Sequence, residues 1–296
     1  MRLRPDWQRS LRNCIPWWTK VVGKLLLVAI PVSHATLRKL GLTRHGDMET
    51  PEWAYEIFGQ HLDQSKTGPI PHGFTVLELG PGDSVFTALL AHAAGAHRTY
   101  IVDVAPMATT DVGLYRRMAA FLKAKGLVSP DLSDATTLED VLAACNAQYL
   151  TAGLDSLREL PTASVDFIFS CSVLQHVHLA ELPQTLAQLR RVIRQSGVSV
   201  HSIDLRDMMG QTLHHLKFPS PIWESAPFRH AAFYTNRLRR DEMLTVFRNA
   251  GFNAESVEDK RWPQLPVSRD RLATHYRRMS EEQLKVWGTI LVARPV

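Results

Sequence analysis

The chain has 296 residues, of which 45% are hydrophobic and 21% are charged, as is typical of a globular protein with a large core. Its formal net charge is +5, but the basic residues are spread along the chain, which disfavours a nucleic-acid-binding groove. The three cysteines, Cys14, Cys145 and Cys171, are widely separated. Their spacing argues against a disulfide framework or a zinc site and favours a reducing cytoplasm, so we expect no bound metal.

Residues 1–40 differ from the rest of the chain, because tryptophans and basic side chains are interleaved there with an apolar run, Val21–Val32. A glycine, a lysine and a proline interrupt this run, and it is shorter than the roughly 20 apolar residues that cross a bilayer. It suits either an added helix packed on the following domain or weak peripheral contact with a membrane through residues 1–40. We predict an N-terminal helical extension or cap over residues 1–72 of a cytoplasmic protein, with a peripheral position at the inner membrane face as the alternative.

Residues 74–103 contain the clearest pattern, in which apolar residues change from a strand-like run to helical spacing and back. This order is typical of a βαβ unit. The turn Gly80-Pro81-Gly82 separates the first strand from the helix, and glycines let a ligand approach the backbone closely. The N–H groups at the helix start favour an anionic group. The expected elements are a strand at Thr75–Leu79, a helix at Ser84–Ala94 and a strand at Thr99–Val102, closed by Asp103.

Two kinds of nucleotide ligand fit this unit. A dinucleotide-binding loop has the pattern G-x-G-x-x-G/A, but Val85 replaces the third small residue. Glu78 instead completes the pattern E-x-G-x-G, and Asp103 follows the next strand. Together they resemble motifs I and II of the class I S-adenosylmethionine (SAM)-dependent methyltransferases. The resemblance implies that Gly80 and Gly82 line the methionine part of SAM. It also implies that Glu78 orients the loop or the amino group of SAM and that Asp103 binds its ribose. A βα turn without any ligand is the structural alternative.

The same turn supports a third interpretation. Gly82-Asp83-Ser84-Val85 looks like the nucleophile block of GDSL-type esterases, in which Ser84 would attack an ester. Those enzymes also need a D-x-x-H block to supply the base, and no aspartate of this chain has a histidine three residues later. The esterase is therefore the weaker alternative.

The segment 105–148 separates Asp103 from the next predicted strand and is long for this kind of domain. We expect helices at Val112–Lys125 and Thr137–Cys145, and then a short strand and turn at Tyr149–Leu154. The family resemblance implies that Leu154 and Asp155 flank the adenine of SAM. For Asp155 a helix cap or loop carboxylate is an equally good interpretation.

A second signature, SVDFIFSCSVLQHV, covers Ser164–Val177 and resembles motif IV of the same family. We expect a buried strand at Val165–Phe169, with Ser170 and Cys171 at its carboxyl end, where ligands bind in open α/β sheets. His176 is the candidate to touch the substrate or the methionine end of SAM, and a hydrogen-bonded structural histidine is the alternative. Gln175 stands where the family commonly has a glutamate, which weakens any role that needs a carboxylate there.

The strand predicted at Val198–Leu205 ends in polar residues that suit acid–base chemistry. Its alternation places Asp204 on one face and His201 on the other. An acceptor hydroxyl needs a base for its proton, and we predict His201 and Asp204 for this role. A polar network at the end of the sheet is the alternative.

The remaining segment contains a second insertion, residues 207–236, rich in aromatic, proline and histidine residues, which we interpret as a lid or substrate wall. A helix at Arg237–Ala250 and strands at Phe252–Glu258 and Trp287–Ala293 then resemble the antiparallel last hairpin of the class I methyltransferases. A helix at Pro51–Leu62, before the first strand, corresponds to one that covers the SAM site in many members, and Leu182–Gln195 is a further expected helix.

The sequence thus predicts a Rossmann-like α/β fold with a seven-stranded, mostly parallel sheet whose last strand is antiparallel, with helices on both faces. The domain spans residues 73–296, with insertions at about 105–148 and 207–236. The resemblance implies a bacterial type 11-like methyltransferase that uses SAM. Its acceptor is a small or medium molecule, most simply an oxygen of a sugar, of a glycan- or lipid-linked intermediate or of another small metabolite. A non-catalytic SAM- or nucleotide-binding module is the second alternative. The implied cofactor-binding set is Glu78, Gly80, Pro81, Gly82, Asp83, Asp103, Val104, Leu154, Asp155, Ser170 and Cys171.

Overall fold

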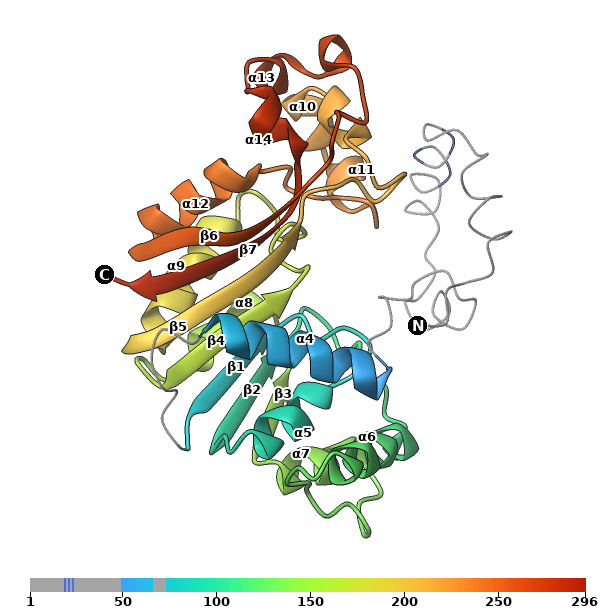
Figure 1. Ribbon diagram of the computed structural model, residues 1–296, viewed down its shortest axis with the longest axis vertical. Helices are drawn as coiled ribbons and strands as arrows, with labels where there is room; N and C mark the ends of the chain where they lie inside the picture. Colours follow the sequence, from blue (N-terminus) through green and yellow to red (C-terminus); the bar gives the residue numbers. More distant parts are fainter. Residues whose placement is uncertain (1–18, 20, 22, 24–48, 66–72) are drawn as a thin grey trace.

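The computed structural model describes residues 19, 21, 23, 49–65 and 73–296, so the predictions for residues 1–40 lie almost wholly outside the described residues. Seven strands form one sheet in the order β3-β2-β1-β4-β5-β7-β6 (Figure 1). Strands β1 to β5 pair in parallel, and β7 is antiparallel to both β5 and β6. The predicted sheet is confirmed. The strands are β1 (Thr75–Leu79), β2 (Arg98–Val102), β3 (Ala147–Leu150), β4 (Val165–Cys171), β5 (Ile193–Asp204), β6 (Phe252–Arg261) and β7 (Val286–Pro295).

Helices cover both faces of the sheet, as Figure 1 shows. On one face α4 (Pro51–Gln64), α5 (Phe86–Ala93), α6 (Val112–Ala124) and α7 (Leu138–Ala144) enclose an apolar core that includes Val76, Ile101 and Phe169. On the other face α8 (Leu154–Glu159), α9 (Leu182–Val192) and α12 (Arg240–Asn249) pack on the opposite side chains of the same strands. The alternation of side chains along each strand therefore divides the interior into two apolar layers.

The turn after β1 has the backbone conformation that its glycines allow. Gly80 has a φ of +66° and Gly82 a φ of +69°, which is the left-handed region that side chains disfavour. A Cβ atom on Gly80 would lie 2.5 Å from a methyl group of Val173. The N–H of Gly80 donates to the carbonyl oxygen of Val102, 2.8 Å away, which fixes the turn at the carboxyl end of the sheet.

Residues 207–236 form a small lobe at one end of the sheet, together with a segment between β6 and β7 for which the sequence analysis predicted no helices (Figure 1). In it Trp223 is fully buried and packs on Phe218, Phe228, Phe233 and Tyr234. The aromatic side chains that we interpreted as a lid or substrate wall therefore contact one another. The lobe contains η1 (His214–Lys217), α10 (Ser220–Trp223), α11 (Ala226–Arg229), η2 (Arg269–Arg271), α13 (Thr274–Arg277) and α14 (Glu281–Lys285).

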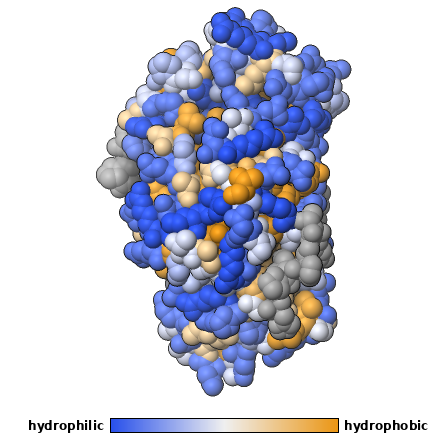
Figure 2. Space-filling model, turned by 90° about the vertical axis from the view of Figure 1, so that its left-hand side faces the viewer, coloured by the Kyte–Doolittle hydropathy of each residue, from blue (hydrophilic) through white to orange (hydrophobic). Residues whose placement is uncertain are grey.

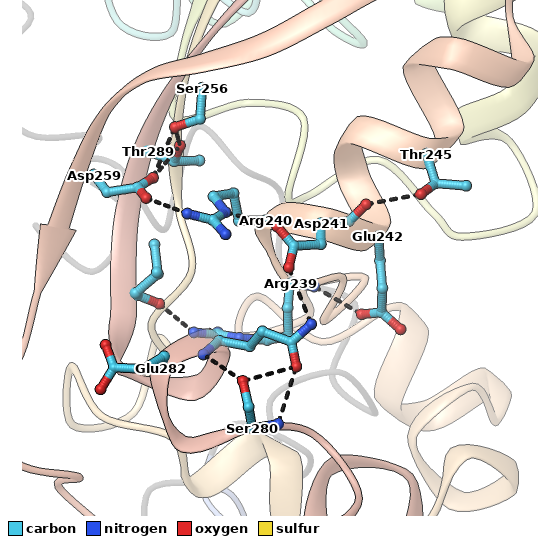
Figure 3. A network of polar contacts seen from close by, with 12 residues as sticks. Arg239, Arg240, Asp241, Glu242, Thr245, Ser256, Asp259, Ser280, Glu282 and Thr289 are labelled. Atoms are coloured by element: carbon cyan, nitrogen blue, oxygen red, sulfur yellow. Dashed lines mark hydrogen bonds and ion pairs between the residues drawn. The ribbon is translucent and has the colours of Figure 1, made fainter.

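A polar network joins this lobe to the antiparallel edge of the sheet (Figure 3). Asp259 on β6 accepts hydrogen bonds from Ser256 at 2.8 Å and from Thr289 at 2.9 Å, and it pairs with Arg240. The fully buried Arg239 donates to the carbonyl oxygens of Leu205, Leu284 and Val286. Arg239 therefore ties the end of β5 to the start of β7.

The outer surface is mainly hydrophilic on the face in Figure 2, with apolar residues in small groups. Among the described residues, no helix combines the length and the apolarity that crossing a bilayer requires.

Candidate active site

Glu78, near the C-terminal end of β1, has a buried side chain with one oxygen that forms no hydrogen bond among the described residues. Glu78 is 5% exposed, and this oxygen is Oε2. Burial raises the pKa of Glu78 to about 8, the Thr87 hydrogen bond opposes the rise, and the charge of Asp103 adds to it. A cation placed beside Glu78 would supply the missing partner and favour the ionised form.

Asp103 lies at the carboxyl end of the neighbouring strand, β2, half-buried, with its Oδ1 accepting from the N–H of Val104 at 2.7 Å. The Val104 side chain next to it is 77% exposed, unusual for an apolar residue of this domain. A carboxylate and an exposed apolar side chain on adjacent residues suit the ribose and the ring of a nucleoside. The structure thus brings Asp103, Val104 and Glu78 to the same edge of the sheet.

The turn after β3 approaches this edge from the other side. Gly153 has a φ of +55° and donates its N–H to the carbonyl oxygen of Asp103, 2.8 Å away. Leu154 begins α8 half-buried, whereas Asp155 is exposed and its carboxylate lies 2.6 Å from a guanidinium nitrogen of Arg158. Of the two residues predicted at the adenine, Leu154 is therefore the better placed for an apolar contact.

The other predicted cofactor residues lie close to the turn. Asp83 is buried, and Pro81 is buried between Gly80 and Gly82. Ser170 is fully buried, and its hydroxyl is bonded within the sheet, so it faces no cavity. Cys171 lines both cavities described below, and burial raises the pKa of its thiol to about 11, so the thiol is protonated at neutral pH.

Two cavities meet at the carboxyl ends of β1, β4 and β5. The smaller lies beside Glu78 and Ser84 under α4. The larger, of about 160 Å³, lies between α4 and the ends of β4, β5, β6 and β7. Ile57 and Cys171 line both cavities, which makes the two neighbours. We call the larger one the acceptor cavity. Its lining includes Gln60, Ser172, Ser202, Asp204, Arg206, Glu258, Lys260, Trp287 and Thr289.

The acceptor cavity carries two ion pairs around one indole ring. Both oxygens of Asp204 are bonded to Arg206, at 2.9 and 2.8 Å, and the Arg206 guanidinium lies 4.4 Å from the centre of the Trp287 ring. Lys260 lies 5.9 Å from the same ring, with its ammonium 3.8 Å from Glu258. The cavity thus offers polar and charged groups beside an aromatic surface, a combination suited to a small polar ligand.

His201 does not suit its predicted role as general base. It is fully buried, with Nδ1 2.7 Å from the hydroxyl of Ser170 and Nε2 2.6 Å from that of Ser199. Burial, with a smaller effect of His61, lowers the pKa of His201 to about 3. The alternation along β5 turns His201 to the α12 face, where its ring packs on Phe247, so it does not reach the acceptor cavity.

The two other predicted catalytic residues differ in position. Asp204 lines the acceptor cavity, but the guanidinium of Arg206 already occupies both of its oxygens. His176 is exposed beyond the end of β4, with Nδ1 2.9 Å from the carbonyl oxygen of Tyr234 in the lobe. The structure does not place His176 among the residues that line either cavity.

Sequence reasoning missed several residues that line or support the acceptor cavity. His61 and Gln60 lie on α4, and their only signal was membership of a predicted covering helix. Arg206, Lys260 and Trp287 lie near the ends of β5, β6 and β7, and they meet only because β7 inserts between the other two strands. Among the described residues, no group of three or more histidine, cysteine, aspartate or glutamate side chains is arranged to hold a metal ion.

Residues 77–201 match the family model described as a methyltransferase domain. No curated protein matches the chain. Solved structures that it resembles include an S-adenosylmethionine-dependent methyltransferase of Mesorhizobium loti, with 19% identity over 83% of this chain and 98% of that chain and a TM-score of 0.43. A SAM-dependent methyltransferase of Archaeoglobus fulgidus has 13% identity over 82% of this chain and 94% of that chain, with a TM-score of 0.45. The YcgJ protein of Bacillus subtilis has 13% identity over 82% of this chain and 99% of that chain, with a TM-score of 0.44.

The overall likenesses to solved structures are weak, so the assignment relies on the family match and on the sheet. The matched residues run from β1 through His201 in β5 and include the glycine turn, Asp103 and the motif IV block. The residues at the carboxyl edge fit SAM, because the unpartnered oxygen of Glu78 suits a cationic ligand and the half-buried Asp103 carboxylate suits ribose hydroxyls. The family match over residues 77–201 and the seven-stranded sheet with antiparallel β7 identify a SAM-dependent methyltransferase domain with the class I fold.

Proposed function

We propose that this enzyme transfers the methyl group of SAM to an oxygen atom of a small or medium acceptor bound in the acceptor cavity. The acceptor classes that we favour are a sugar, a glycan- or lipid-linked intermediate and another small metabolite. The observation that carries the proposal is the position of the cavity, which adjoins the Glu78 cavity at Ile57 and Cys171. An acceptor there would lie beside the methionine end of SAM.

We propose that Glu78, Asp103 and Val104 hold SAM, with the turn from Gly80 to Asp83. Asp103 would accept hydrogen bonds from the ribose hydroxyls, and Val104 and Leu154 would contact the adenine. SAM supplies a methyl group on a sulfonium, a good leaving group, so the protein has mainly to align the acceptor and provide for its proton.

The lining of the acceptor cavity supports a polar acceptor. The hydroxyl-bearing residues Ser172, Ser202 and Thr289 line it, and the Trp287 ring offers a flat apolar surface. Sugar rings combine hydroxyl groups with apolar faces, so they match such a lining. The cavity also carries charges of both signs, which balance within the pairs Asp204–Arg206 and Glu258–Lys260.

The domain boundaries also remain a proposal. We propose that α4 belongs to an N-terminal cap over residues 1–72 and that the domain spans 73–296, with insertions at about 105–148 and 207–236. Contacts of α4 with the cavities and with α5 and α6 support a cap that completes the active site.

The test is transfer of an isotopically labelled methyl group from SAM to pooled hydroxyl acceptors, including monosaccharides, nucleotide sugars and lipid-linked sugars. We expect labelled product with at least one pool, reduced by Trp287→Ala while SAM binding is unchanged. SAM binding without transfer to any pool would favour the non-catalytic module instead. Ester hydrolysis that Ser84→Ala abolishes would favour the esterase.

A further inference from the structure

A hydrogen bond between α4 and β5 lies at the wall of the acceptor cavity. His61 on α4 is 1% exposed, and its Nε2 atom lies 2.8 Å from the hydroxyl oxygen of Ser202. Ser202 is half-buried and lines the acceptor cavity, whereas His61 lies behind it. The pair therefore connects a cavity surface to a buried imidazole, a connection that none of the predicted catalytic residues provides.

The second nitrogen of His61 fixes the direction of this hydrogen bond. Nδ1 lies 2.7 Å from the carbonyl oxygen of Ile57, and because a carbonyl oxygen only accepts, this contact favours the tautomer with the proton on Nδ1. Burial lowers the pKa of His61, against the opposing hydrogen bonds to the backbone of Ile57 and Ser170, so the ring is neutral at neutral pH, and in this tautomer Nε2 accepts. The hydroxyl of Ser202 therefore donates to Nε2, and its oxygen lone pairs remain available to a donor in the cavity.

We propose that Ser202 and His61 form a proton relay that deprotonates the acceptor hydroxyl, a role that depends on the proposed function. Ser202 touches the acceptor and accepts its proton, while the proton of Ser202 passes to Nε2 of His61. In the same step the acceptor oxygen forms a bond to the methyl carbon as the bond from that carbon to sulfur breaks. His61 acts through Ser202 and leaves the step as an imidazolium.

The charge balance favours this route. The positive charge that His61 gains replaces the sulfonium charge lost in the same step, so the total charge of the site does not change. Separating charge in a buried site is costly, and this step moves a positive charge without creating a new pair of opposite charges. Asp204 would also conserve the total charge, but protonating it would break its bidentate pair with Arg206.

The surroundings of His61 are mainly apolar. Its ring packs on Phe169 on β4, at 5.4 Å between centroids, and no carboxylate of the described residues contacts it. No fixed negative charge therefore holds the imidazolium, which returns its proton readily. The elements packed around α4 carry further titratable and charged groups: Cys171 on β4, His201, Asp204 and Arg206 on or after β5, Glu258 and Lys260 on β6, and Lys125, which follows α6 and stacks on Tyr55 of α4.

A purely structural bond between α4 and β5 is the competing explanation, and the proton on His61 distinguishes the two without any acceptor. We would record nitrogen-15 NMR spectra of the full chain labelled in histidine, assigning His61 by its loss in His61→Gln. We expect a neutral ring with the proton on Nδ1 between pH 6.5 and 8.5, and an Nε2 signal that shifts in Ser202→Ala. A proton on Nε2 would overturn the relay, because that atom could not then accept from Ser202.

The second measurement is the pH profile of turnover with an acceptor that the wild type methylates. We expect His61→Gln to lower kcat about 100-fold at pH 7, as loss of general base catalysis does, and to leave SAM binding unchanged. Its remaining rate should rise about tenfold per pH unit as hydroxide replaces the base. Ser202→Ala should behave like His61→Gln, whereas Ser202→Thr, which keeps the hydroxyl, should retain most of the activity.

The control is His97→Gln, which changes an exposed histidine at the opposite, amino end of β2 and should leave kcat and its pH profile unchanged. A His61→Gln enzyme that keeps the pH profile of the wild type would overturn the relay and leave the proposed function intact. A wild type that binds no SAM or methylates no acceptor would overturn the proposed function and the relay together.

Discussion

The proposed SAM side of the sheet and the proposed acceptor side are built in different ways. At β1 and β2 the proposed site consists of residues close in sequence: the turn at Gly80, the carboxyl group of Glu78 and, one βα unit later, Asp103. Around α4, β5, β6 and β7 it consists of residues as far apart as Gln60, Ser202, Lys260 and Trp287. The first side depends on local backbone geometry and the second on the insertion of β7 between β5 and β6.

The comparison implies that the two sides respond differently to mutation. The lobe supports the acceptor side through buried aromatic packing around Trp223 and through the polar network in Figure 3. The proposed SAM side depends on a turn whose conformation requires glycine and on two carboxyl groups. Damage to the lobe should therefore affect stability and acceptor use, and damage to the turn should affect SAM binding.

The largest effect on stability should come from Trp223→Ala. Trp223 is fully buried, and its indole N–H donates to the carbonyl oxygen of Thr235 at 2.7 Å, so the change removes packing and leaves that oxygen without its donor. We expect the free energy of unfolding to fall by about 3–5 kcal/mol in a denaturant titration. Trp262→Ala, at a half-buried position of the same lobe, should cost less. If SAM affinity fell in proportion to stability in Trp223→Ala, the two sides of the sheet would not respond independently to mutation.

Gly80→Ala should reduce SAM affinity strongly and stability only moderately, the reverse of Trp223→Ala. An alanine there would be held at a φ of +66°, which costs about 1–2 kcal/mol, and its Cβ would collide with Val173. We expect at least a tenfold loss of SAM affinity, because the turn must shift, and a stability loss smaller than that of Trp223→Ala. The matched control is Gly126→Ala, at a φ of +72° with no atom within 4 Å of the new Cβ. That control should cost stability without any change in SAM affinity.

Glu78→Gln tests the proposed SAM side through the protons that are released when SAM binds. The pKa of Glu78 is raised to about 8, so without ligand the carboxyl is about nine-tenths protonated at pH 7. A cationic ligand lowers that pKa, so SAM binding should release close to one proton at pH 7 and should weaken as the pH falls below 8. Calorimetry in buffers of different ionisation enthalpy measures the release. Glu78→Gln should abolish this release. A wild type that released no proton on binding SAM would show that Glu78 does not contact the ligand.

The same shift has a consequence for stability. Because the folded-state pKa of Glu78 is raised above its ordinary value of 4.5, its contribution is favourable at low pH and is lost as the pH rises through about 8. Glu78→Gln should therefore raise the melting temperature at pH 8 more than at pH 5. An equal change at both pH values would contradict the raised pKa.

The sequence predicted the SAM side far better than the acceptor side. The strand–turn–helix pattern of residues 74–103 depends on residues that are neighbours in the chain, so β1, α5 and β2 appear nearly as predicted. His201 was placed on the correct face of β5, but nothing local indicated that Ser170 and Ser199 occupy its nitrogens. The sequence did not predict the lobe as one unit, because its apolar cluster joins Leu213 and Leu216, before β6 in the chain, to Leu272 and Tyr276, which follow β6.

The most direct test of the account is a calorimetric titration of SAM and NAD into the wild type and into Asp103→Ala and Asp155→Ala. Both substitutions remove one carboxylate after a strand, but only Asp103 adjoins Val104 at the proposed ribose site, while Asp155 pairs with Arg158. We predict SAM binding without NAD binding, weakened about 100-fold or more by Asp103→Ala, which loses two hydrogen bonds to a charged group, and nearly unchanged by Asp155→Ala. Equal SAM affinity in Asp103→Ala and the wild type, or binding of NAD in place of SAM, would contradict the proposal that Asp103 binds the ribose of SAM.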